Sequence, residues 1–128
     1  MSLLQVDDLP ALRSRLRDAG VAAIELDLSG CDSKASLMQR CAAHLQLPAG
    51  FGHNWDALND ALREGLLAQH AQRGLGVVII TGSETLSRAA PAVVSTLQAL
   101  LLELTTSFDS ETCLAYWVAP ASRGGSPR

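Results

Sequence analysis

The pattern of apolar and polar positions divides the chain into alternating helices and strands. Residues 8–19 repeat leucines at helical spacing, with a proline near the start and a glycine after the end, which predicts an N-terminal helix. Residues 21–28 then alternate apolar and polar side chains with period two, which is typical of a half-buried strand. The next helix is predicted over residues 33–45, with Asp32 or Ser33 as its N-cap.

The second half of the chain repeats this alternation. A helix is predicted from Trp55 to about residue 70, and the β-branched run Val77–Ile80 predicts a central strand covered on both faces. A short capped turn is expected at Ser83–Glu84, before a long helix that begins at Pro91. Residues 112–118 form the last predicted strand. This order predicts an α/β protein with a three-stranded, mostly parallel sheet packed against helices and an extra N-terminal helix.

Length and composition fit a single domain over residues 1–128, with a disordered tail expected at 119–128. Apolar residues make up 48% of the chain, which is enough for a packed core and argues against intrinsic disorder. The 13 acidic and 10 basic residues give a net charge of −3. This charge argues against direct binding of nucleic acid, because phosphate contacts need a basic surface, and it favours cationic partners.

Cysteine usage and the lack of targeting features predict a soluble, cytoplasmic protein. Cys31, Cys41 and Cys113 show no C-x-x-C spacing, so buried free thiols are expected. No apolar run approaches the roughly 18 residues of a membrane span, and the first residues lack the basic and apolar regions of a signal peptide. We expect no membrane association and a monomer in the free state.

Motifs of known catalytic, metal and cofactor sites are absent from the sequence. His44, His53 and His70 show no ligand spacing, and there is no P-loop, dinucleotide-binding or nucleophile-elbow motif. We therefore predict neither a metal nor a cofactor. One helical turn separates Asp56 from Asp60, as a catalytic carboxylate pair would require, but a convex helix face offers no cleft to shift a pKa. The prediction is a protein that is not an enzyme.

The stretch from Pro48 to Gly65 carries the sharpest functional signal. It starts as a proline- and glycine-rich loop and becomes a helix, with Asn54 as the predicted N-cap. One side of this helix is an apolar stripe, and a row of carboxylates lies about 100 to 180° around the helix from it. The stripe consists of Trp55, Leu58, Leu62 and Leu66, and the row, called the acidic row below, consists of Asp56, Asp60 and Glu64.

The acidic row has a structural and a functional interpretation. Three acids on an outer face usually form a solvated surface, and Asp56 also suits the positive end of the helix dipole. However, like charges one turn apart destabilise a helix by about 0.2–0.5 kcal/mol per pair, and Arg63 beside the row relieves this only in part. That loss of stability is weak evidence of use in binding. Trp55 is expected to anchor the core, whereas Phe51 is either a contact aromatic or a plug over the core.

The segment Gly52-His-Asn-Trp-Asp-Ala-Leu-Asn-Asp-Ala-Leu62 resembles the signature of the barstar family, intracellular inhibitors of barnase-type ribonucleases. In that signature a glycine and an asparagine precede a D-A-L-x-D-x-L helix, and the resemblance covers roughly residues 22–118. It implies a three-stranded parallel sheet flanked by helices, with the motif helix and its preceding loop inserted into the basic active site of a nuclease. On this resemblance Asp56 and Asp60 contact cationic residues of the nuclease, and Asp60 fills the phosphate position.

The resemblance also implies further contact positions. An acidic contact from the long helix falls near Leu102 or Glu103. Two residues depart from the family pattern: Gly50 precedes Phe51 where the family has an aromatic, and Asn59 stands where it has a tryptophan, which removes part of the aromatic contact surface. The predicted partner-binding residues are Phe51, Gly52, His53, Asp56, Asn59, Asp60, Arg63 and Glu64, and the predicted structural residues are Asn54, Trp55, Leu58 and Leu62.

We therefore predict an intracellular inhibitor of a basic, barnase-type ribonuclease or a related nuclease toxin. A carboxylate row mimics substrate phosphates, steers a basic nuclease toward the site, and blocks the substrate without performing chemistry. Two alternatives stay open. One is a non-inhibitory interaction or regulatory module that binds another cationic protein; the other is a small enzyme or RNA-binding domain, which a cleft with a pKa-shifted acid would favour.

Overall fold

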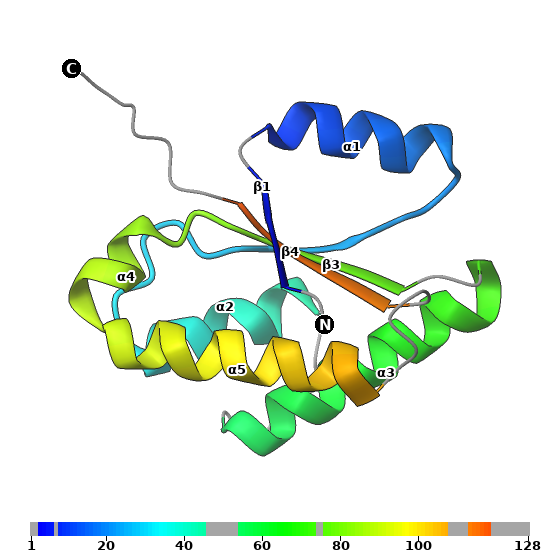
Figure 1. Cartoon of the computed structure of the whole chain (residues 1–128). Coiled ribbons are helices and arrows are strands. Elements are labelled where there is room, and N and C mark those ends of the chain that lie inside the picture. The colour runs from blue at the N-terminus through cyan, green and yellow to red at the C-terminus, as the bar shows by residue number, and fades with distance from the viewer. Residues whose placement is uncertain (1–2, 7, 46–53, 74–75, 108–112, 119–128) are drawn as a thin grey trace.

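Four parallel strands form one sheet at the centre of the molecule (Figure 1). The structure is a computed structural model, and it describes residues 3–6, 8–45, 54–73, 76–107 and 113–118. Across the sheet, the strands lie in the order β1 (Leu3–Val6), β4 (Cys113–Val118), β3 (Gly76–Thr81) and β2 (Ile24–Asp27). Parallel neighbours cannot be joined by tight hairpins, so helices supply the connections.

Helices cover both faces of the sheet unequally (Figure 1). The single helix α1 (Leu9–Asp18) covers one face. The other face carries α2 (Lys34–His44), α3 (Trp55–Arg73), α4 (Glu84–Ala89) and α5 (Pro91–Ser107). The chain crosses the sheet in one direction from β1 to β2 and returns through β3 to β4. Because such crossovers are right-handed, this reversal of direction places α1 on the opposite face from the other helices.

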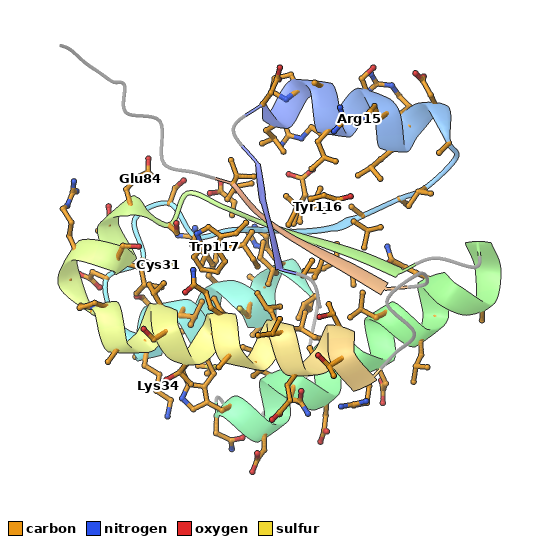
Figure 2. The ribbon with its side chains drawn as sticks, in the orientation of Figure 1. Arg15, Cys31, Lys34, Glu84, Tyr116 and Trp117 are labelled. Atoms are coloured by element: carbon orange, nitrogen blue, oxygen red, sulfur yellow. The ribbon has the colours of Figure 1, made fainter. Side chains whose placement is uncertain are left out.

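Successive residues of the two central strands divide between two cores. Val78 and Ile80 of β3 belong to a large core with α2 to α5, whereas Val77 and Ile79 belong to a small core with α1. All four are at most 1% exposed, so the prediction of a strand covered on both faces is confirmed. Figure 2 shows the same alternation in β4, where Trp117 points into the large core and Tyr116 lies toward α1.

The sequence prediction of an α/β class, three parallel strands and an N-terminal helix is confirmed. The sheet also contains β1, which the sequence analysis missed because four residues give too short an apolar pattern. The capped turn predicted at Ser83–Glu84 is wrong. That segment opens the six-residue helix α4, and the Ser83 side chain is buried without making a capping hydrogen bond. The tail predicted at 119–128 lies outside the described residues.

Local hydrogen bonding determines which residue is the N-cap of α2. Ser33 is the N-cap rather than Asp32, because Ser33 and Ser36 exchange backbone and side-chain hydrogen bonds in a capping box.

Cys31 and Cys41 are buried and free, as predicted. Burial raises the pKa of the Cys41 thiol to about 12, so this thiol stays protonated and unreactive at neutral pH.

An ion pair joins α1 to the edge strand β2. Arg13 of α1 donates two hydrogen bonds to the carboxylate of Glu25 in β2, at 3.0 Å from Nε and 2.6 Å from Nη2. Both side chains are at least one-third exposed, so this ion pair fixes geometry more than it adds stability. None of the helices in the described part of the chain combines the length and apolarity needed to cross a bilayer.

Gly82 lies at a tight approach between the carboxyl ends of β2 and β3. The Asp27 carboxylate accepts hydrogen bonds from the hydroxyl and the backbone N–H of Ser29, and these hold the pKa of Asp27 below its usual value. Gly82 has φ +67°, and a Cβ there would lie 2.4 Å from the Ser29 hydroxyl oxygen and 2.7 Å from Oδ1 of Asp27. Only glycine fits this position without strain.

We expect Gly82→Ala to lower the free energy of unfolding by about 2–4 kcal/mol, because it adds a steric overlap to an unfavourable left-handed backbone. Urea denaturation measures this change. Gly30→Ala is the matched control, since Gly30 also has positive φ but nothing lies within 4 Å of the added Cβ. Gly30→Ala should therefore lose only about 1 kcal/mol. Equal losses at the two glycines would contradict the described packing around Gly82.

Candidate functional site

Helix α3 begins at the N-cap predicted from the sequence. The side-chain oxygen of Asn54 accepts a hydrogen bond from the backbone N–H of Ala57 at 2.8 Å, and its carbonyl accepts one from Leu58 at 3.0 Å. These bonds satisfy part of the first turn, which otherwise has unpaired N–H groups. The 19 residues of α3 give a rod about 28 Å long, at about 1.5 Å per residue.

One face of α3 is buried and the other is exposed to solvent, as the periodicity predicts. Leu58, Leu62 and Leu66 are at most 1% exposed and pack in the large core. All members of the acidic row, Asp56, Asp60 and Glu64, are exposed. In the described part of the chain the one salt bridge joins Arg13 to Glu25, so the acidic row has no ion-pair partner there.

Two features of the C-terminal half of α3 fix this helix against the sheet and thereby set the direction of the face that carries the acidic row. Gln69 accepts a hydrogen bond from the backbone N–H of Val77 at 3.0 Å and donates one to the carbonyl of Ala22. It therefore joins α3 to β3 and to the segment before β2. A Cβ at Gly65 would lie 2.9 Å from Cδ1 of Ile24, so glycine permits this close approach of helix and strand. Nothing in the sequence pattern singled out Gln69.

A hollow of about 260 Å³ lies between α3 and α5 beside the acidic row. Its lining consists of three residues of α3 and four of α5: Trp55, Asp56, Asn59, Thr96, Ala99, Leu100 and Glu103. The expectation of an entirely convex acidic face is therefore wrong at the Asp56 end, because packing of α5 against α3 creates a concavity. Of the two α5 positions considered, Glu103 lines this hollow and Leu102 does not.

Trp55 combines the core role predicted for it with a place at the surface. It is half-buried against the large core and also lines the hollow. On its ring lies the ammonium of Lys34 from α2, 5.7 Å from the ring centroid, which is within the range of a cation–π contact. Figure 2 shows Lys34 at the outer side of the helical layer. The Lys34 ammonium is therefore a cation beside Trp55, the residue that precedes the acidic row.

The remaining predicted contact residues differ in what the structure says of them. Asn59 is half-buried at the hollow, and Arg63 is half-buried beside the acidic row, where it makes an interaction of its own. Phe51, Gly52 and His53 lie outside the described residues, so their contact roles stay predictions. Within the described ranges no group of three or more histidine, cysteine, aspartate or glutamate side chains is placed to hold a metal ion.

The fold and the surface together define a class of protein: an α/β domain that presents a row of exposed carboxylates on the outer face of one capped helix. The family model described as barstar (barnase inhibitor) matches residues 21–118, and the chain belongs to this family. The match begins after β1 and α1, so these two elements lie outside it. A search of curated proteins and a search of solved structures each gave no match.

Proposed function

We propose that this protein inhibits a basic ribonuclease of the barnase type, or a related nuclease toxin, by covering its active site with the acidic row and the loop before α3. The observation that carries the proposal is the acidic row itself. Its three exposed carboxylates have no ion-pair partner in the described part of the chain. They lie on a helix whose opposite face is fixed in the core, in a chain whose family is described as a barnase inhibitor.

Electrostatic complementarity supplies the first step of this mechanism. A ribonuclease active site is cationic because it binds phosphates, and a row of negative charges attracts it over distances up to about one Debye length. Because α3 is held by Gln69 and the large core, the backbone positions of the acidic row are fixed before the partner arrives. Such preorganisation reduces the ordering entropy lost on binding.

The hollow between α3 and α5 supplies a second, more specific contact. Asp56 and Glu103 add two acidic residues from different helices to its lining, and Trp55 and Leu100 add two apolar residues. An arginine of the partner fits this combination, because its aliphatic stem packs on apolar surface while its guanidinium hydrogen-bonds to carboxylates. We assign the Asp56 end of the acidic row to this contact and Asp60 to the phosphate position of the nuclease.

The test is an RNA-cleavage assay with barnase as the probe. We expect the protein to inhibit cleavage competitively, so that raising the RNA concentration restores activity, because carboxylates and RNA phosphates occupy the same cationic site. Binding of barnase without loss of cleavage would instead favour the non-inhibitory interaction module. The absence of both binding and inhibition would contradict the proposal for barnase-type enzymes.

A further inference from the structure

Leu67 is an apolar side chain in an unexpected place. Its exposed fraction is 49%, and among the described residues only Leu67 and Leu102 are large apolar side chains with such exposure. Leu67 is not part of the large core, because the neighbouring Leu66 occupies the buried face of this turn of α3. Leu67 therefore projects toward solvent from a helix whose opposite side is fully packed.

The position of Leu67 around the helix continues the acidic row. At about 100° per residue, Leu67 lies about 20° from Asp56 and about 20° from Asp60, and it is two turns beyond Asp60. At about 1.5 Å per residue, the distance from Asp60 to Leu67 along the helix axis is about 10 Å. On the same side of the helix, the exposed residue four positions later is the small Ala71, and the exposed residue three positions earlier is Glu64 of the acidic row.

We propose that Leu67 is part of the same binding surface as the acidic row, and that the partner carries an apolar pocket about 10 Å from the cationic site that receives Asp60. This inference rests on the proposed function and narrows the class of partner. The partner is a basic protein whose surface combines a cationic cleft with a neighbouring apolar pocket. The acidic row attracts any basic protein, because this attraction depends only on charge. An apolar contact to Leu67 would be made only by a partner that also carries the pocket, so Leu67 adds specificity.

Charge also argues against a second copy of this chain as the occupant. Two copies meeting through this face would bring both acidic rows, each with three carboxylates and no ion-pair partner in the described residues, into one interface. Like charges brought together in this way oppose association. A cationic partner is attracted by the same carboxylates and can bury Leu67 at the same time.

The experiment measures the dissociation constant for barnase at two salt concentrations, for the unsubstituted protein and for Leu67→Ala. We expect Leu67→Ala to weaken binding about five- to tenfold at both salt concentrations, because the lost contact is apolar and salt does not screen it. Leu67→Met is the matched control, because it keeps a large apolar side chain at the same exposed position. We expect Leu67→Met to change binding less than twofold.

Three outcomes would overturn the inference, and they differ in what else they affect. Unchanged binding by Leu67→Ala, or equal losses in Leu67→Ala and Leu67→Met, overturns the inference and leaves the proposed function standing. Failure of the unsubstituted protein to bind barnase counts against the proposed function and removes the inference with it. Superimposable thermal unfolding curves for the variants exclude misfolding as the cause of any loss.

Discussion

Replacing Asp60 with alanine is expected to weaken inhibition of barnase by at least about thirtyfold. Asp60 is an exposed carboxylate in the middle of the acidic row, and in the proposed complex it is buried against the cationic site of the nuclease. Removing one member of a buried, hydrogen-bonded charge pair raises the free energy of binding by about 2–5 kcal/mol. The barnase–barstar pair is itself a source of such values, so this magnitude is carried over from the family. The measurement is the inhibition constant at fixed salt.

Two controls separate a local contact from a general change in charge or stability. Asp18→Ala changes the net charge equally, but Asp18 is an exposed residue at the end of α1, on the opposite side of the sheet from α3 (Figure 1). It should change the inhibition constant only a few-fold. Asp60→Ala should not lower stability, since it removes like-charge repulsion along α3. Equal losses of inhibition in the two variants would show that net charge, and not position on α3, governs binding.

Replacing Leu62 with alanine is expected to have the converse effect, a large loss of stability with little direct change in the contact surface. Leu62 is 0% exposed within the large core and lies two residues beyond Asp60 on the other face of α3. Truncating a fully buried leucine lowers the free energy of unfolding by about 2–5 kcal/mol, because apolar burial is lost and a cavity remains. Urea denaturation with a fixed m-value measures this loss.

Leu67→Ala provides the matched comparison for the core prediction, because it is the same substitution on the same helix at a position 49% exposed. Its effect on the free energy of unfolding should be below about 1 kcal/mol. At temperatures where the Leu62→Ala variant remains folded, the inhibition constant of this variant should stay within a few-fold of the inhibition constant of the unsubstituted protein. A Leu62 variant as stable as the Leu67 variant would contradict the assignment of the two faces of α3.

The faces of α3 were predictable because helical periodicity is a local property of sequence. Leucines at positions 58, 62 and 66 and acids at 56, 60 and 64 must lie on different sides of any α-helix, and they do. The run Val77–Ile80 was equally informative, since four consecutive apolar β-branched residues suit a strand buried on both faces. In each case the signal extends over enough residues to identify the element.

Features that depend on contacts between distant segments could not be predicted from the sequence. Strand β1 has four residues, and its pairing with β4 joins Leu3 to Ala115 across most of the chain. The hollow beside Asp56 exists only because α5 packs against α3, so no local pattern could show it or choose Glu103 over Leu102. Gln69 lies in a polar stretch of α3, and its bridging role appears only when β3 and the segment before β2 are in place.

The salt dependence of barnase inhibition reports on whether the acidic row blocks a cationic nuclease site. The inhibition constants of the unsubstituted protein and of Asp60→Ala are measured over a range of ionic strength. We expect strong inhibition at low salt, a steep weakening as salt rises, and a higher inhibition constant with a shallower slope for Asp60→Ala. An absence of inhibition by the unsubstituted protein, or inhibition that is equally strong at every salt concentration and in both proteins, would contradict this expectation.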